Sequence, residues 1–261
     1  MYIRYEVADK IATITLNRPE AANAQNGALL DELDEAWRRA ADDEAVAVIV
    51  LRAEGKHFSA GHDLNDKSWP DPSTITLDRI YGLETRRYLE YSLRWRNVPK
   101  PSIAAVQGRC IAGGLLLCWP CDLIVAAEDA QFSDPVVLMG IGGVEYHGHT
   151  WELGPRKAKE ILFTGRAVTA AEAEQVGMVN KVVPRADLDA ETAALAARIA
   201  AMPPFGLRQA KRAVNQTLDV QGFYAAIQSV FDVHQTGHGN ALSVNGYPIL
   251  VNLDQMKAAI E

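Results

Sequence analysis

Hydrophobic and polar residues alternate with two different periods along the chain. Short β-branched runs within residues 2–16 predict a strand pair. Between Asn26 and Ala41 the apolar residues recur at helical spacing, which predicts an amphipathic helix. Three continuous apolar runs are typical of strands that are covered on both faces, and they extend from Val46 to Leu51, Ser102 to Val106 and Leu123 to Ala127.

The alternation of these strands with helical segments predicts the fold class. Strands that alternate with helices along the chain are typical of a right-handed α/β architecture with parallel strands and crossover helices. From Glu172 onward the pattern is mostly helical, with a break at Pro203-Pro204 and no strand signal in the last sixty residues. We therefore expect a strand-rich core over residues 1–195 and a C-terminal helical region over residues 196–261.

Composition and charge limit the possible partners. The 261 residues are 48% hydrophobic and 23% charged, which allows a large buried core and excludes intrinsic disorder. The 26 Lys and Arg residues against 33 Asp and Glu residues give a formal net charge of −7. This balance predicts that nucleic acid is not a partner, because binding phosphates requires a basic face.

The cysteines and the amino terminus indicate a cytoplasmic protein without a membrane partner. Three cysteines do not make a disulfide framework, and the first ten residues contain no apolar signal-peptide core. The most membrane-like stretch, Cys110 to Ala127, is interrupted by glycines, Pro120 and Asp122. The CxxC spacing of Cys118 and Cys121 follows an apolar helix rather than opening one, which favours buried structural thiols.

Two short loops carry the residues that point to chemistry. Residues 57–64 follow the predicted strand that ends at Leu51, and residues 108–114 lie between the predicted strand Ser102 to Val106 and an apolar helix. Small residues let a backbone approach a ligand closely, and two such loops could each direct one N–H group at a single carbonyl oxygen. Either loop alone is better explained as a tight turn, but the two together point to an oxyanion hole.

The segment from Asn65 to Asn97 looks like an insertion over this body. It contains a Pro-rich start and a helical stretch rich in aromatic and arginine residues. We expect it to form a lid or a pocket wall. Its aromatic side chains either line an acyl pocket or belong to the core; they are Trp69, Tyr81, Tyr88 and Trp95.

Taken together, the motifs resemble those of the crotonase family, also called the enoyl-CoA hydratase and isomerase superfamily. The similarity covers residues 11 to about 185. The matching stretches are Asn17-Arg18-Pro19 with Asn23-Ala24, Phe58 to Leu64, Lys100-Pro101 with Ala104 to Val106, Gly108 to Gly114, Cys121 to Leu123, Ala130 to Phe132, Leu162 to Gly165 and Ala170 to Val183.

The resemblance implies a fold, an assembly and a substrate class. The fold would be a spiral of ββα units with C-terminal trimerising helices, assembled as a homotrimer or a dimer of trimers. The substrates would be acyl-CoA thioesters, so coenzyme A arrives as part of the substrate and no cofactor is bound permanently. By position, the oxyanion-hole amides would be those of His62 and Gly113. The adenine end of CoA would lie against the backbone around four residues, namely Ser59, Ala60, Asp63 and Leu64.

The sequence departs from the family at both catalytic positions of its hydratases. Where those enzymes carry glutamate, this chain has Leu116, three residues after Gly113, and Val136, directly after Asp134-Pro135. An aliphatic side chain cannot transfer a proton. Hydration by the two-glutamate mechanism of the family is therefore not expected.

A replacement acid or base could come from the segment Gly140 to His149. Its Gly-Ile-Gly resembles that of the family's aryl-CoA dehalogenases, which carry a catalytic aspartate soon afterwards. We take Glu145 as the candidate base or nucleophile, assisted by Tyr146 or His147, with the His62 side chain as a secondary candidate. The sequence is equally compatible with a structural role, in which Glu145 lies at the subunit surface or forms an ion pair with Arg156 or Lys157.

Two further polar features have plain structural explanations. His147-Gly148-His149 has ligand-like spacing, but no other His or Cys cluster accompanies it in the sequence, so we predict no metal site. Asp134 either faces the acyl pocket or forms a turn before Pro135.

Two functions remain open at this stage. The first is an acyl-CoA enzyme that holds a thioester enolate and catalyses an isomerisation, a hydration or a carbon-bond step. The second is a catalytically degenerate protein that binds or carries acyl-CoA, as the two aliphatic replacements would allow. A purely structural subunit comes last, because it would not require both small-residue loops.

Overall fold

The computed structural model describes residues 1–69, 71, 74–251 and 255. A six-stranded sheet forms its centre, in the order β1-β2-β3-β4-β6-β9, and β1 is its only antiparallel member among the described residues. The bounds are Ile3–Ala8 for β1, Ile11–Leu16 for β2, Val48–Ala53 for β3, Ser102–Val106 for β4, Leu123–Ala127 for β6 and Lys181–Val183 for β9.

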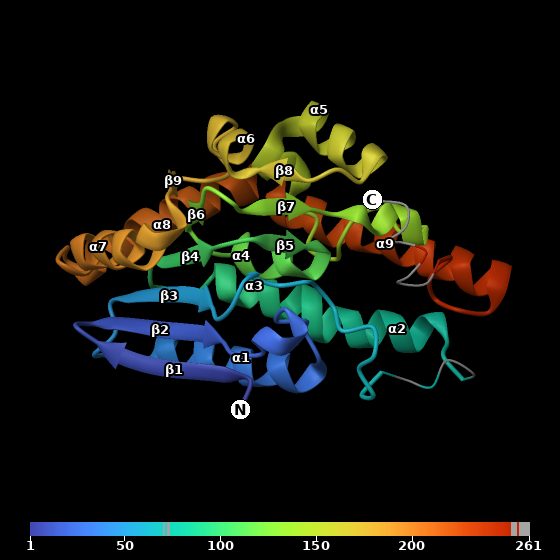
Figure 1. The fold of residues 1–261 in the computed structure, drawn as a ribbon, viewed down its shortest axis with the longest axis horizontal. Coiled ribbons are helices and arrows are strands. Elements are labelled where there is room, and N and C mark those ends of the chain that lie inside the picture. Colours follow the sequence, from blue (N-terminus) through green and yellow to red (C-terminus); the bar gives the residue numbers. More distant parts are fainter. Residues whose placement is uncertain (70, 72–73, 252–254, 256–261) are drawn as a thin grey trace.

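A second sheet of three short strands lies beside the first (Figure 1). It consists of β5 (Arg109–Ile111), β7 (Gln131–Ser133) and β8 (Val168–Thr169). β5 follows β4 directly, and β7 follows β6, so two consecutive strand pairs each contribute one strand to each sheet. This arrangement brings the loop after β4 and the loop after β6 to the same region.

Helices surround the two sheets and fill the C-terminal part of the described chain. The α-helices are α1 (Gly27–Asp42), α2 (Leu77–Glu84), α3 (Glu90–Arg96), α4 (Leu115–Cys118), α5 (His149–Thr164), α6 (Ala170–Gln175), α7 (Leu188–Ala200), α8 (Pro204–Val220) and α9 (Phe223–Asn245). A π-helical turn, η2 (Thr85–Leu89), joins α2 to α3, and short 3-10 turns are η1 (Pro19–Ala21), η3 (Ala112–Gly114), η4 (Pro135–Met139) and η5 (Arg185–Asp187).

Most sequence predictions for the first half are confirmed, but the strand expected from Val46 to Leu51 is β3, which begins two residues later because Val46 N closes a turn on the Asp43 oxygen. β1 and β2 form the expected hairpin, and β4 and β6 have the expected bounds. The helix expected from Asn26 begins one residue later as α1, because the Asn26 side chain accepts a hydrogen bond from Leu29 N and caps the helix. Pairing of β2, β3, β4 and β6 is parallel, as the α/β pattern indicated.

Both faces of the parallel strands are buried, which explains their uninterrupted apolar runs. One face packs on α1 and the segment of η2 and α3, and the other packs on α7. The boundary expected at residue 195 falls inside α7, whose Leu188 and Ala196 are part of the core against β3. The break in the helical region comes after α7, between Ala200 and Pro204.

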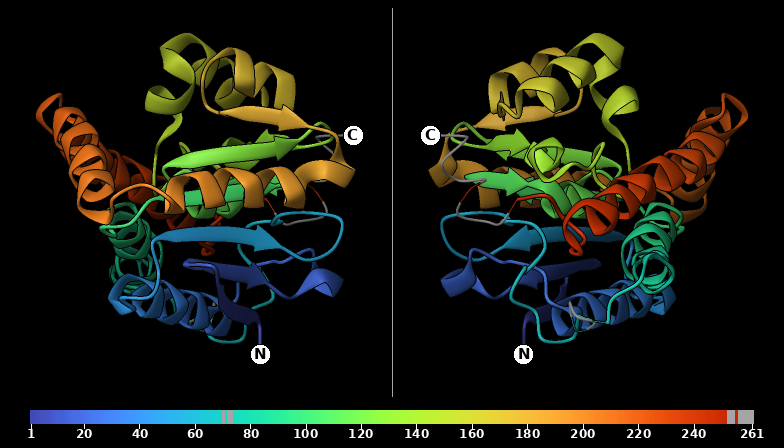
Figure 2. Two further views of the ribbon diagram at one scale, coloured as in Figure 1. Left: turned by 90° about the vertical axis from the view of Figure 1, so that its left-hand side faces the viewer. Right: turned by 90° about the vertical axis from the view of Figure 1, so that its right-hand side faces the viewer.

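The C-terminal helices extend away from this body. Figure 2 shows α8 and the adjoining part of α9 projecting to one side of the sheets. None of the helices in the described part of the chain combines the length and the apolarity that crossing a bilayer requires. All three cysteines are buried and unbridged, and burial raises the pKa of the Cys118 and Cys121 thiols, in line with the structural role expected for them.

Candidate active site

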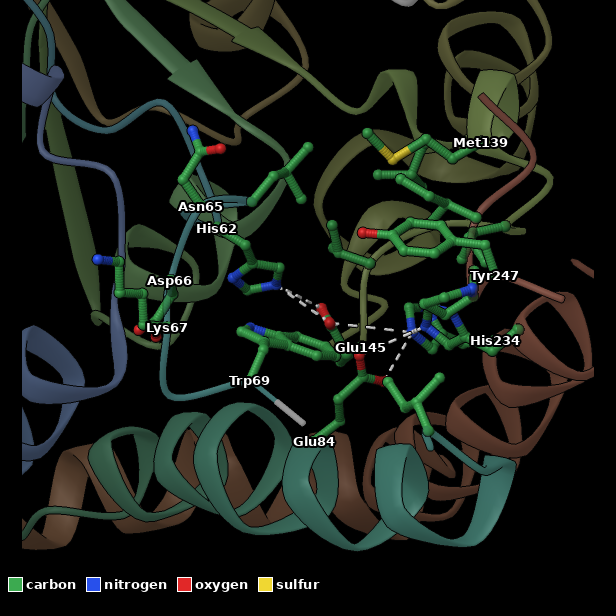
Figure 3. A pocket seen from close by; sticks show the side chains of 18 residues that line it. His62, Asn65, Asp66, Lys67, Trp69, Glu84, Met139, Glu145, His234 and Tyr247 are labelled. Carbon is green, nitrogen blue, oxygen red and sulfur yellow. Dashed lines mark hydrogen bonds and ion pairs between the residues drawn. The ribbon is translucent and has the colours of Figure 1, made fainter. Parts of the chain in front are cut away.

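A cavity of about 310 Å³ opens between the loop after β3, the turn after β7, α2 and α9. Figure 3 shows that side chains from widely separated parts of the sequence face one another inside it. It is lined by His62, Leu64, Asn65, Asp66, Lys67, Trp69, Ile75, Glu84, Val136, Met139, Ile141, Val144, Glu145, His234, His238, Tyr247, Pro248 and Ile249.

The two small-residue loops pack directly on each other at one end of this cavity. Gln25 Nε2 donates to the Gly113 carbonyl at 2.7 Å and to Ser59 Oγ at 3.3 Å, which ties both loops together. Gly61 has a φ of +88°, and a Cβ there would lie 2.7 Å from the Ile111 oxygen. Glycine is therefore required at position 61 both by conformation and by space.

Two backbone N–H groups at this junction remain available. Gln25 bonds to the residues on either side of His62, since Gln25 N donates to the Gly61 oxygen and Asp63 N donates to the Gln25 oxygen. Within the described residues no hydrogen bond outside the regular elements uses the N–H of His62 or of Gly113, and Gly113 lies in the first turn of η3, where N–H groups have no partner inside the helix. Both therefore remain free for a ligand oxygen.

The residues expected to contact CoA divide into inner and outer positions. Ser59 is buried, and its hydroxyl donates to the Asn23 carbonyl. The Ala60 N–H donates to the Ala22 carbonyl oxygen. The Asp63 carboxylate forms an ion pair with Arg18 at 2.7 Å. Leu64 lines the cavity and is 43% exposed.

Glu145 is buried in the cavity wall and is paired with His62. Its Oε1 and Oε2 lie 3.0 Å and 3.3 Å from His62 Nε2. The His62 ring stacks on Tyr88, with 3.9 Å between ring centroids, which fixes its orientation. The alternative that Glu145 lies at the surface or pairs with Arg156 or Lys157 is wrong, because only 2% of Glu145 is exposed and its partner is His62.

A buried aspartate holds the segment that carries Glu145. Asp134 Oδ2 accepts a hydrogen bond from Val144 N at 2.9 Å and lies 2.9 Å from His149 Nε2. Although burial opposes its charge, His149 and the backbone N–H donors lower the pKa of Asp134. Asp134 does not line the cavity, so of its two predicted roles the turn-forming one is correct.

Tyr146 and His147, the expected assistants of Glu145, point elsewhere. Tyr146 is buried beside Glu152 at a second cavity of about 450 Å³, and burial raises the pKa of its hydroxyl. His147 packs on the His149 ring, and burial lowers its pKa to about 4. Neither residue lines the cavity that holds Glu145.

Sequence reasoning missed three buried residues of this cavity: Glu84, His234 and His238. His234 Nε2 lies 3.2 Å from Glu84 Oε2 and 3.8 Å from Glu145 Oε1. Burial opposes a charge on His234, but the Glu145 and Glu84 carboxylates raise its pKa to about 9. The spacing of the two histidines, one helical turn apart, was a usable signal, whereas Glu84 is 150 positions from His234 and gave none.

The inserted segment forms a wall of the cavity, as expected. Asp66, Trp69 and Glu84 line the cavity, and the polypeptide just after α9 closes it from the opposite direction with Tyr247. The other aromatic residues of the segment do not line it. Tyr88 and Trp95 are core residues, and Tyr81 is at the surface.

The two positions of the expected glutamates differ in their surroundings. Val136 lines the cavity with an aliphatic side chain, whereas Leu116 is buried in the core and does not reach the lining. Proton transfer from either position is ruled out by the chemistry of these side chains.

An α/β scaffold with two neighbouring small-residue loops and an enclosed carboxylate agrees with the family that the sequence motifs resemble. A family model described as enoyl-CoA hydratase/isomerase matches residues 6–239. The chain belongs to this enoyl-CoA hydratase/isomerase family, which confirms the resemblance noted in its motifs.

Individual relatives of the chain are also named as enoyl-CoA hydratases or as a related CoA-thioester hydratase. A Mycobacterium tuberculosis protein named as an enoyl-CoA hydratase, EchA13, is 44% identical over 94% of this chain and 83% of its own length. The 2,3-dehydroadipyl-CoA hydratase of Escherichia coli is 36% identical over 81% of this chain and 80% of its own. A crystal structure from Mycobacterium thermoresistibile, also named as an enoyl-CoA hydratase, is 80% identical with a TM-score of 0.93, covering 95% of this chain and 99% of that one.

Proposed function

We propose that this protein is an acyl-CoA enzyme that forms a thioester enolate, with Glu145 as the base. The observation that carries the proposal is the enclosed Glu145 carboxylate, 3.0 Å from His62 Nε2, in the cavity beside two free amides. The family and the names of its relatives support an acyl-CoA substrate.

The amides of His62 and Gly113 are the proposed oxyanion hole. The two loops are close enough that a Cβ on Gly61 would lie 3.2 Å from Gly113 N. Paired N–H donors stabilise negative charge on a thioester oxygen most strongly where water is excluded. The backbone around Ser59, Ala60, Asp63 and Leu64 is the proposed contact for the adenine end of CoA.

The proposed step is a proton transfer at the carbon next to the thioester carbonyl. Glu145 takes the α-proton, the bonding electrons move onto the thioester oxygen, and the two amides hold the resulting enolate. Return of a proton to the α-carbon or to a conjugated carbon completes an exchange or an isomerisation. His62 donates to the Glu145 carboxylate and thereby orients it.

This assignment accounts for the missing glutamates of the family's hydratases. Leu116 and Val136 offer no proton, so the polar chemistry has moved to the Glu145 and His62 side of the cavity. A single buried carboxylate with an orienting imidazole is sufficient for removal and return of one proton.

The test is α-proton exchange in D₂O, followed by mass spectrometry, over a panel of saturated, unsaturated and aromatic acyl-CoAs. For any substrate that exchanges, Glu145→Gln should lower the exchange rate by about a thousandfold, since general base catalysis contributes roughly 10²–10⁴. Binding of the same acyl-CoA should change by only a few-fold, because the amides that hold the thioester are intact.

Glu128→Gln, which neutralises an exposed carboxylate, is the matched control and should leave exchange unchanged. Exchange that survives Glu145→Gln would reject Glu145 as the base. Tight binding without exchange for every panel member would instead make the protein an acyl-CoA carrier.

The assembly belongs to the same proposal. A spiral of ββα units with a homotrimer or a dimer of trimers is the proposed architecture, and a cytoplasmic location is the proposed setting. The alternating strand pairs support the spiral, and the exposed apolar side chains of α8 support the assembly of subunits.

A further inference from the structure

The strongest unexplained feature of the cavity is a cluster of two imidazoles and a carboxylate on its α2 and α9 side. Glu84 ends α2, and His234 and His238 lie one turn apart on α9. The exposed fractions of the three residues are 2%, 5% and 6%. Figure 3 shows Glu84 and His234 converging from different helices toward the cavity.

The protonation of both imidazoles is fixed by backbone carbonyls on their far sides. His234 Nδ1 lies 2.6 Å from the Gly143 oxygen, and His238 Nδ1 lies 2.7 Å from the Pro248 oxygen. A carbonyl only accepts hydrogen bonds, so each Nδ1 carries the hydrogen. In the neutral ring each Nε2 is then a free electron pair, the tautomer that metal-binding histidines adopt.

The two Nε2 atoms face one another and the carboxylate. The two Nε2 atoms are 3.2 Å apart, His234 Nε2 is 3.2 Å from Glu84 Oε2, and His238 Nε2 is 3.4 Å from Glu84 Oε1. Donor atoms bound at about 2.0–2.1 Å around a tetrahedral ion are about 3.3 Å from each other. The separation of the two Nε2 atoms matches an edge of such a coordination sphere, and each Nε2 has one oxygen of the Glu84 carboxylate at a comparable distance. One ligand atom from each of the three residues lies within 4.8 Å of the others.

Surrounding groups orient the cluster as they do in established metal sites. Gln235 Nε2 donates to Glu84 Oε2 at 2.6 Å and fixes the carboxylate, while the two backbone carbonyls fix the rings. All three residues line the cavity, so a further coordination position faces the space where a ligand would enter.

We propose that Glu84, His234 and His238 form a binding site for a divalent first-row transition-metal ion, with zinc as the best match. Two imidazoles with one carboxylate suit zinc or its first-row neighbours, whereas magnesium and calcium prefer sets made of oxygen ligands. The competing explanation is that a shared proton alone holds the cluster together.

The first experiment is a titration of the chelator-treated full chain with Zn²⁺, by calorimetry and by metal analysis after dialysis. The expected result is one zinc ion per chain, bound with micromolar or tighter affinity. His234→Gln and His238→Gln should each weaken binding by about a hundredfold or more, because each removes one ligand. His57→Gln is the matched control, since His57 lies outside the cavity, and should leave the affinity unchanged.

A second measurement uses the unaltered protein, so it does not depend on folding of the variants. Co²⁺ in a site with three protein ligands gives the intense visible absorption of four- or five-coordinate cobalt, whereas hexahydrated cobalt absorbs weakly. Weak absorption with no saturation, or histidine variants that both bind Zn²⁺ with the wild-type affinity, would overturn the proposal. Metal binding is measured without acyl-CoA, so its outcome is independent of whether Glu145 is the base.

Discussion

Two buried carboxylates of this protein are paired with histidines. Glu145 lies beside His62, and Asp134 lies beside His149. Burying an isolated charge is strongly unfavourable, and an imidazole neighbour offsets that cost by hydrogen bonding or by its own charge. The pairing explains how the cavity retains ionisable groups so far from solvent.

Glu152, in the first turn of α5, breaks this rule. In the described part of the chain no hydrogen bond or ion pair holds its carboxylate, and burial raises its pKa to about 7. The folded protein therefore keeps Glu152 protonated at pH values where the unfolded chain has already lost that proton.

We predict a pH-dependent stabilisation by Glu152→Gln. In the wild type the free energy of unfolding should fall between about pH 4.5 and pH 7, because ionisation favours the unfolded chain, and stay low above that range. The variant should be more stable than the wild type by up to about 3 kcal/mol at pH 8, which corresponds to the shift in the pKa, and equal to it near pH 4.

Urea unfolding at a series of pH values measures this difference. Glu128→Gln removes an exposed carboxylate and should give the wild-type curve throughout. A Glu152→Gln protein whose advantage does not grow with pH would contradict the assignment of a partly buried carboxyl without a partner.

At the scale of elements, one side chain joins α1 to α3. Asp34 of α1 is 1% exposed, and its Oδ1 accepts hydrogen bonds from Arg94 Nη2 at 2.8 Å and from Trp95 Nε1 at 3.0 Å. The indole of Trp95 stacks on Trp37 of α1. The contact between the helices therefore combines a buried polar centre with aromatic packing.

We predict that Asp34→Ala lowers the free energy of unfolding by about 2 to 3 kcal/mol. The variant leaves the buried Trp95 N–H without an acceptor, which costs more than the net value of the lost hydrogen bond. Glu35→Ala, at the next residue of the same helix, is the control and should change stability by less than about 0.5 kcal/mol, because Glu35 is 71% exposed. Equal effects of the two substitutions in urea unfolding would refute the role of Asp34.

At the scale of the whole molecule, α8 is the element that a single chain leaves uncovered. None of its residues is buried, and Phe205 and Val220 are 67% and 89% exposed. Figure 2 shows the helix projecting from the sheets. A helix that exposes large apolar side chains in this way is typical of an interface between subunits.

We predict that the protein forms trimers or hexamers and that Val220→Asp shifts them toward monomers. Light scattering after size exclusion, at several concentrations of a 28.5 kDa chain, measures the mass directly. Val7→Asp on the edge strand β1 places the same charge at another exposed valine and should leave the assembly intact. A wild-type protein that is monomeric at every concentration would exclude this role for α8.

The sequence by itself determined the α/β class, the first hairpin, the parallel strands and the two small-residue loops. These features depend on local patterns, since strand periodicity, helix capping and glycine conformations are set by near neighbours in the chain. The family was also identifiable from ordered motifs, and Glu145 could be singled out because it follows the Gly-Ile-Gly segment.

Only the tertiary structure decided which polar residues share the cavity. The structure joins His62 to Glu145 and Glu84 to His234, across 83 and 150 positions of sequence. It also turns Tyr146 away from its neighbour Glu145, because adjacent residues of an irregular loop need not face the same side. Contacts of this kind depend on how the helices and loops pack in three dimensions, a property that no local pattern of the chain encodes.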